Sequence, residues 1–207
     1  MFDLLIIGGG VAGVSCALIV GSGLKRPYAE GKKVGIFTHQ KASSLVNGLY
    51  NNAYGIPAGT YGRDILISSL EQLHTQYPEV EQIDGEKVMG VTGTAGDFTV
   101  TTNKGTYHAK AVVIAIGSAG NFDIEGLTQF VIPNKKAMPE KNRIQLSNDD
   151  HLVTDGVYVA GTLAGTRSQL TIAAGSGAAV GADILSLWNN GTHTQSHDSL
   201  PLELRVK

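Results

Sequence analysis

The sequence predicts an α/β fold: a mainly parallel sheet flanked by helices, with a small antiparallel β-meander attached. Three observations indicate this fold class. An apolar run, Leu4–Ile7, leads directly into Gly-x-Gly-x-x-Gly and an apolar helix, as the first strand of a parallel sheet does. Two further apolar runs, 111–116 and 157–160, have the length of buried parallel strands. Before the first of these, turn residues at 93–97 and 103–105 separate three short segments, which is typical of a meander.

The glycine motif predicts where a dinucleotide would lie. Gly8 allows the tight turn out of the strand, Gly10 lets the backbone approach the phosphates, and Gly13 lets the next helix pack closely. The amides of Val11, Ala12 and Gly13 would then point at the anion from a helix N-terminus. The alternative is a glycine-rich turn without a ligand, because 27 of the 207 residues are Gly.

The first half of the chain continues with a second strand at 33–37, which completes a β-α-β unit. Residues 38–62 form a long irregular connection, and a loop of that size in a compact domain usually has a function. An amphipathic helix follows at 64–76, with Leu66, Leu70 and Leu73 on its apolar side.

The second half supplies the rest of the sheet. A strand at 80–83 precedes the three meander segments at 87–92, 97–102 and 105–108, and residues 121–150 are polar with little periodicity. We expect strands at 111–117 and 157–161, a helix at 171–188 and a polar tail at 189–207, with helices on both faces of the sheet.

Composition and charge exclude several classes of function. The net charge of −2 and the pI of about 6.3 give no basic field for nucleic acid or an acidic membrane. We see no apolar run of membrane-spanning length and no signal-peptide pattern, so we expect a cytoplasmic protein without a membrane partner. Cys16 is the single cysteine, which excludes a Cys-x-x-Cys redox pair within this chain and favours core packing. The six His are scattered, so we expect no metal site.

The order of these segments resembles the FAD-binding domain of the two-dinucleotide-binding flavoproteins, and most closely their thioredoxin reductase-like branch. The matching stretches cover residues 1–118 and 152–188. They are the glycine motif, 51–59, the Val-Ile-Ala-Ile-Gly strand at 113–117, the Gly-Val-Tyr-Val-Ala-Gly strand at 156–161, and 169–174. The resemblance implies a Rossmann-like FAD-binding domain over residues 1–188.

The resemblance also implies a layout for FAD. The pyrophosphate would lie on the glycine motif, the adenosine beside the second strand and the meander, and the flavin against the 51–59 loop and the last helix. A helix N-terminus at the N1/O2 edge would stabilise the negative charge of reduced flavin. The implied cofactor-binding residues are Gly8, Gly10, Val11, Ala12, Gly13, Thr38, His39, Asn51, Asn52, Val88, Ala115, Ile116, Gly117, Gly161, Thr162, Gln169, Leu170 and Thr171.

The chain departs from the family pattern in three places. The interval 118–156, where the family carries an NAD(P)H-binding domain, is too short for one and has no second glycine motif. Thr38 and Thr162 stand where the family has acidic residues. Losing both carboxylates would weaken FAD binding by roughly a hundredfold or more.

These features together predict an FAD-binding oxidoreductase whose flavin is reduced by an external donor or a partner reductase, with a small molecule, quinone or dioxygen as acceptor. The missing second domain would leave one flavin face open, so we expect a homodimer. One alternative is a dinucleotide-binding module without catalysis. Another is a relative of the FAD domain of tRNA-modifying flavoproteins, although the chain lacks a basic surface.

No catalytic side chain can be identified from the sequence. Tyr50 and Tyr54 border the expected flavin loop and would either stack on the ring or pack in the core. The basic residues at 135–136 and 141–143 are expected to form a solvated surface.

Overall fold

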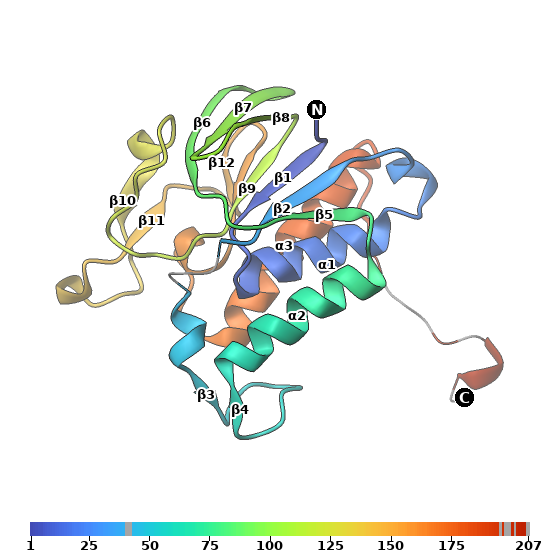
Figure 1. Cartoon of the computed structure of the whole chain (residues 1–207), viewed down its shortest axis with the longest axis horizontal. Helices are drawn as coiled ribbons and strands as arrows, with labels where there is room; N and C mark the ends of the chain where they lie inside the picture. Colours follow the sequence, from blue (N-terminus) through green and yellow to red (C-terminus); the bar gives the residue numbers. More distant parts are fainter. Residues whose placement is uncertain (40–42, 195, 197–199, 201, 206–207) are drawn as a thin grey trace.

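A six-stranded sheet forms the centre of the computed structural model, which describes residues 1–39, 43–194, 196, 200 and 202–205 (Figure 1). The strand order is β12-β13-β9-β1-β2-β5. All neighbours pair in parallel except β12 and β13 at one edge. The bounds are β1 (Leu4–Ile7), β2 (Val34–Phe37), β5 (Val80–Ile83), β9 (Val112–Ile114), β12 (Leu152–Thr154) and β13 (Val157–Val159). The predicted α/β class with a mainly parallel sheet is therefore confirmed.

The three α-helices among the described residues cover one face of this sheet. They are α1 (Val11–Gly23), α2 (Gly62–Gln76) and α3 (Leu170–Trp188). Leu4 and Ile6 of β1 point into this helical layer, where they share one apolar cluster with Val20, Leu73 and Ile184. Cys16 is fully buried in the same cluster, and burial raises the pKa of its thiol to about 12, so it packs as a core residue.

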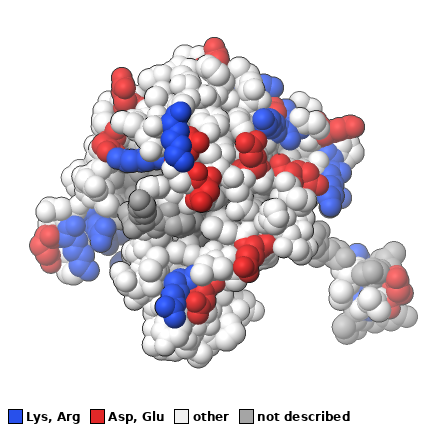
Figure 2. All heavy atoms as spheres, viewed as in Figure 1, with Lys and Arg blue, Asp and Glu red and all other residues white. Residues whose placement is uncertain are grey.

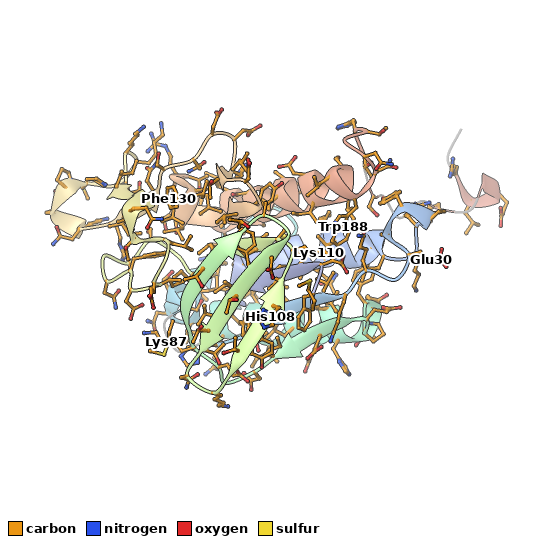
Figure 3. The ribbon with its side chains drawn as sticks, turned by 90° about the horizontal axis from the view of Figure 1, so that it is seen from above. Glu30, Lys87, His108, Lys110, Phe130 and Trp188 are labelled. Carbon is orange, nitrogen blue, oxygen red and sulfur yellow. The ribbon has the colours of Figure 1, made fainter. Side chains whose placement is uncertain are left out.

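The meander covers the opposite face. It consists of β6 (Val88–Thr94), β7 (Asp97–Thr102) and β8 (Thr106–Ala109). In Figure 3, Lys87 and His108 mark the meander side and Trp188 marks the end of α3. Leu5 and Ile7, the alternate residues of β1, pack here with Phe98 and Val100. The expectation of helices on both faces is thus wrong: the alternating apolar residues of the meander bury the second face instead.

Short ribbons and 3₁₀ turns occupy the stretches expected to be irregular. The ribbons are β3 (Leu49–Tyr50) with β4 (Thr60–Tyr61), and β10 (Val131–Pro133) with β11 (Ile144–Leu146). The turns are η1 (Pro27–Ala29), η2 (Ser44–Asn47), η3 (Thr128–Phe130), η4 (Pro139–Lys141), η5 (Gly161–Ala164) and η6 (Leu202–Leu204). Strands of two or three residues are too short to show a period of two in the sequence.

The beginning of the predicted polar tail packs on the helical layer. The Asn189 side chain donates to the hydroxyl of Thr194 at 3.0 Å, and Thr194 is buried. Ser22 near the end of α1 donates to the hydroxyl of Ser196 at 2.7 Å. Residues 189–196, as far as they are described, therefore close the end of the α1–α3 pair.

Helices α1 and α3 cross in close contact at glycines. A Cβ on Gly177 would meet the backbone carbonyl of Ala12, and one on Gly181 would lie 2.8 Å from Cβ of Ile19. α3 is 19 residues long and apolar enough to cross a membrane by length and composition, so the expectation that no apolar run reaches this length is wrong. α3 packs against α1 and buries its Val180 and Ile184, as a core helix does. A core helix can also meet the length and composition criteria for a membrane span.

The α1–α3 crossing makes a stability prediction. We expect Gly177→Ala to destabilise the fold by at least about 2 kcal/mol, because the added methyl meets backbone that cannot move aside. Gly175→Ala on the same helix is the matched control: its Cβ meets nothing within 4 Å, and Ala should stabilise the helix by about 0.5–1 kcal/mol. Urea unfolding followed by circular dichroism measures both, and equal effects of the two substitutions would contradict the packing argument.

Asp3 joins three segments at the start of β1. Its carboxylate accepts hydrogen bonds from the backbone N–H of Lys33 at 3.0 Å, from Nζ of Lys110 at 2.9 Å and from Nζ of Lys32 at 3.2 Å. Burial raises the pKa of this carboxyl, but the hydrogen bonds from Lys33, Lys110 and Lys32 outweigh it, so the net pKa lies below the ordinary value of 3.8.

A depressed pKa in the folded state stabilises the fold only while the carboxyl is ionised. We therefore expect Asp3→Asn to lower the free energy of unfolding by about 1–3 kcal/mol at pH 7 and pH 5. Below pH 3.8 the difference from the wild type should shrink, as pH falls through the folded pKa. Urea titrations at each pH test this, with the exposed Glu71→Gln as control; an Asp3→Asn effect that persists undiminished at pH 2 would refute it.

Candidate functional site

A cleft of about 700 Å³ opens where β1, β9 and β13 end. The carboxyl ends of parallel strands lie at the same edge of a sheet, and ligands of open α/β sheets bind outside that edge. Along the cleft, Ile7 ends β1 and Gly8 follows it, Ala115 follows β9, and Ala160 follows β13. The lining therefore comes from segments that are far apart in the sequence.

Most of the residues predicted to bind a cofactor line this cleft. They are Gly8, Gly10, Val11, Ala12, His39, Val88, Ala115, Ile116, Gly117, Gly161, Thr162, Gln169 and Leu170. Tyr50 also lines the cleft and is half-buried, whereas Tyr54 is 96% exposed and lies off it.

The other predicted residues do not line the cleft. Gly13 lies behind the β1–α1 turn, where a Cβ would meet the carbonyl of Gly8. Asn51 uses its side-chain oxygen to accept from the backbone N–H of Gly59 at 2.8 Å, and the exposed Asn52 adjoins it in the β3–β4 loop. Thr171 is exposed one residue past Leu170 on α3. Thr38 is buried behind the cleft wall.

The turn after β1 forms a cradle of backbone. Gly8 has φ of 118°, in a region that favours glycine, and a Cβ on it would lie 2.5 Å from the carbonyl oxygen of Ala115. Gly10 is different: its φ of −83° suits any residue, and a Cβ there would meet nothing within 4 Å. The missing side chain of Gly10 thus leaves open space, as the approach of a phosphate requires.

Two helix N-termini open onto the cleft. Val11 and Ala12 begin α1, and Gln169 and Leu170 begin α3. Neither first turn contains an acidic residue, and neither N-cap side chain accepts a hydrogen bond from it. The positive ends of both helix dipoles therefore face the same space, which favours an anionic ligand.

The acidic side chains on the cleft wall are already engaged. Glu86 accepts hydrogen bonds from the hydroxyls of Thr102 at 2.7 Å and Tyr107 at 2.9 Å, and its pKa is lowered, with the Thr102 hydrogen bond as the largest cause. Asp123 pairs with Nζ of Lys87 at 2.6 Å. The sequence placed the 86–88 segment near the adenosine but did not show that Glu86 brings a carboxylate to the cleft.

Thr38 forms hydrogen bonds at the end of β5. Its hydroxyl lies 3.3 Å from Oδ1 of Asp84 and 3.4 Å from the carbonyl of Ile83. A carboxylate therefore does stand beside the end of β2, but it comes from a residue 46 positions later in the chain. The sequence pattern around residues 33–39 gave no signal for it.

Three cations on the cleft come from the connection between β10 and β11. Lys136, Lys141 and Arg143 line it, although we expected this basic stretch to be plain solvated surface. The ribbon is tied to the cleft by Asn134, whose side chain is buried and donates to the carbonyl of Thr162 at 2.9 Å. The sequence carried no signal for this placement, because it rests on contacts between distant segments, such as Asn134 with Thr162 and the backbone N–H of Ile144 with the carbonyl of Ser118.

A buried polar chain supports the cleft floor at Gly161. Oγ of Ser176 accepts the backbone N–H of Gly161 at 2.8 Å, and Nε2 of His151 lies 2.9 Å from the same Oγ. Since Oγ accepts from Gly161, its own hydrogen is available to His151. Asp150 and His151 both have positive φ, 43° and 72°, and this turn directs the imidazole toward α3.

Within residues 1–39, 43–194 and the described part of the tail, no group of three or more His, Cys, Asp or Glu side chains is placed to hold a metal ion. The residues on the cleft fit a dinucleotide instead: an open glycine cradle and two helix N-termini.

Comparisons with known proteins agree with this fit. The family model described as pyridine nucleotide-disulphide oxidoreductase matches residues 2–172. A ferredoxin–NADP reductase from Levilactobacillus brevis is 33% identical over 181 residues, which are 85% of this chain and 47% of that protein. The chain thus spans about half the length, or less, of the curated relatives it matches.

Solved structures share the fold. A thioredoxin reductase from Gloeobacter violaceus superposes with a TM-score of 0.70 at 15% identity, covering 97% of this chain and 99% of that one. A ferredoxin-flavin thioredoxin reductase from Clostridium acetobutylicum gives a TM-score of 0.66 at 16% identity, covering 91% and 98%. At these identities the likeness establishes the fold alone.

The hydrogen bond between Ser176 and Gly161 predicts that loss of the Ser176 hydroxyl destabilises the fold. We expect Ser176→Ala to lower the free energy of unfolding by about 1–3 kcal/mol, because the buried N–H of Gly161 loses its acceptor. Ser68→Ala is the control: that exposed hydroxyl only donates to the carbonyl of Ile65, and its loss should cost less than about 0.5 kcal/mol. Urea unfolding of both variants decides the point, and a Ser176→Ala variant as stable as Ser68→Ala would refute the role of the hydroxyl.

Proposed function

The chain belongs to the pyridine nucleotide-disulphide oxidoreductase family, and we propose that it is an FAD-binding oxidoreductase whose flavin is reduced by an external donor or a partner redox protein. One observation carries the proposal: α1 and α3 open together onto a cleft with a glycine cradle, and no acidic residue occupies either first turn. Such a site matches an anionic dinucleotide, with its pyrophosphate at α1 and its flavin at α3.

Different residues of this chain would bind different parts of the cofactor. Gly10, Val11 and Ala12 would hold the pyrophosphate, with the backbone close to the phosphate oxygens. His39 and Glu86 line the part of the cleft assigned to the adenosine, where the Glu86 carboxylate can accept hydrogen bonds from ribose hydroxyls. Gly161 and Thr162 would meet the ribityl chain.

The first turn of α3 would face the flavin. Bound there, FAD supplies the electron-transfer chemistry, and the protein sets its orientation and potential. The N-terminus of α3 would stabilise negative charge at the adjoining edge of the ring, and Gln169 would offer a side-chain hydrogen bond to it.

The donor would come from outside this chain. Residues 118–156 form ribbons and turns in this structure, so the chain brings no second dinucleotide-binding domain in that interval. Relatives with names that include ferredoxin support a protein donor, and a small molecule, quinone or dioxygen is the proposed acceptor. We propose a homodimer, because without a second domain in the 118–156 interval one face of the flavin would stay open, and we propose a cytoplasmic location.

A second candidate is a dinucleotide-binding module without turnover. It is favoured by Thr38, which is buried with its hydroxyl on Ile83 and Asp84, because neither Thr38 nor the Asp84 carboxylate lines the cleft in place of the acidic residue of the family. Weak retention of FAD would be its signature.

Visible absorption of the purified protein, before and after adding FAD and desalting, tests the function. We expect flavin bands near roughly 370 and 450 nm that survive desalting and bleach with a chemical reductant. A colourless protein that retains no added FAD would exclude the oxidoreductase and leave the glycine cradle to another nucleotide.

Adding one methyl group at Gly10 tests whether the glycine cradle binds the pyrophosphate. We expect Gly10→Ala to weaken FAD binding by about tenfold or more, because its Cβ projects into the space for the pyrophosphate. Folding should be unaffected, since that Cβ touches nothing within 4 Å. Gly105→Ala, on a turn of the meander with equal space around its Cβ, is the matched control and should bind FAD like the wild type. Fluorescence titration with FAD measures both, and equal affinities would contradict the assigned place of the pyrophosphate.

A further inference from the structure

The connection between β10 and β11 forms a basic ribbon tip, residues 134–143, at the rim of the cleft. It stands in the interval where the family carries its second domain. The tip holds Lys135, Lys136, Lys141 and Arg143 against one acidic residue, Glu140. Its net charge is therefore +3 in a chain with a net charge of −2. On the face shown in Figure 2, Lys and Arg side chains gather at the left, where Figure 1 places the end of this ribbon.

The charges of the tip are uncompensated. All four cations are exposed, and none of them forms an ion pair with the part of the chain that the structure describes. By contrast, Lys32 and Lys110 share Asp3, and Lys87 pairs with Asp123. The positive field at the tip is thus available to an external partner.

The tip is fixed to the cleft by buried amides. Asn134 donates to the carbonyl of Thr162 at 2.9 Å, and the side-chain oxygen of Gln145 accepts the backbone N–H of Lys135 at 3.0 Å. Asn134 also accepts the backbone N–H of Lys136 at 2.9 Å. Asn134 and Gln145 are 8% and 6% exposed, so the cations stand on an ordered base.

The tip combines charge with an apolar side chain. Met138, at its centre, is 53% exposed, and Lys136, Met138 and Lys141 all line the cleft. Methionine and arginine are enriched at protein interfaces, whereas the three lysines of the tip would act on a partner through their charge.

We propose that the basic ribbon tip is the docking surface for an acidic electron-carrier protein of the ferredoxin type. This inference rests on the proposed function, because the carrier would be the external electron donor of the flavin. Opposite charge would guide the carrier to the mouth of the cleft and set its orientation there. A separate carrier protein bound at the tip would take the place of the domain that the family carries in the same interval.

The experiment measures binding of a bacterial ferredoxin by isothermal titration calorimetry, at about 50 mM and about 500 mM NaCl. Wild-type protein should bind at low salt and lose most of its affinity at high salt. The fourfold variant Lys135→Gln/Lys136→Gln/Lys141→Gln/Arg143→Gln should bind roughly tenfold more weakly at low salt and show little salt dependence.

The control removes charge elsewhere. Lys25 and Arg26 are exposed and follow the C-terminal end of α1, about 20 Å along the helix from the cleft. Lys25→Gln/Arg26→Gln should keep its ferredoxin affinity within about twofold. The twofold ribbon variant Lys135→Gln/Lys141→Gln carries the same change in charge and should be several-fold weaker. Equal affinities of these two double variants would overturn the proposal.

Flavin retention distinguishes a failure of the docking surface from a failure of the proposed function. The 450 nm absorbance and the thermal midpoint of every variant are measured beside the titration, so a misfolded variant is recognised. If the fourfold variant folds but loses FAD, the cations serve the cofactor and the docking surface is wrong. It is also wrong if ferredoxin fails to bind while NADP⁺ binds the wild type and is lost in the variant. Tip-dependent ferredoxin binding to a protein that retains no FAD would support the surface and refute the oxidoreductase.

Discussion

The backbones of α1, α3 and the turn after β1 approach so closely that only glycine fits at the contacts, and the cleft depends on that approach. Gly13 lies against the carbonyl of Gly8, and Gly177 lies against the carbonyl of Ala12. These contacts bring the first turns of α1 and α3 to one place at the end of β1. A side chain at either glycine would move a helix, and with it the positive end of a dipole.

The sheet sets the second constraint, because its parallel strands are apolar on both faces. The helical layer buries Leu4 and Ile6, and a second layer has to bury Leu5 and Ile7 on the other face. The meander supplies that layer without a helix, and its first strand also carries Val88 to the cleft. One antiparallel unit thus completes the core and forms a wall of the site.

The sequence allowed prediction of what is encoded locally. The glycine motif and the apolar strands are contiguous, so the main strands, α1 and α3 followed from the pattern, whereas most of the residues expected around the cofactor came from the resemblance to the flavoprotein family. The helical layer on a single face could not be foreseen, since periodicity shows that a strand is buried but not by what. Asp84 beside Thr38, Ser176 beneath Gly161 and Asn134 on Thr162 join distant segments through single side chains, and no local pattern marks such contacts. The β10–β11 ribbon was missed because three-residue strands have no readable period.

The electrostatics of the cleft follow from which charges are already paired. Asp123 is paired with Lys87, whereas Glu86 accepts hydrogen bonds from two neutral hydroxyls and keeps its negative charge. The cations at the ribbon tip have no ion-pair partners among the described residues, and two helix dipoles add to them. The cleft and its rim are therefore positive although the whole chain is slightly acidic. A bound pyrophosphate would neutralise the dipoles at the cradle but would leave the exposed side chains of the tip in solvent. The field that remains at the rim then acts on larger anions, and it is strongest for a protein that covers the cleft and excludes water from the contact.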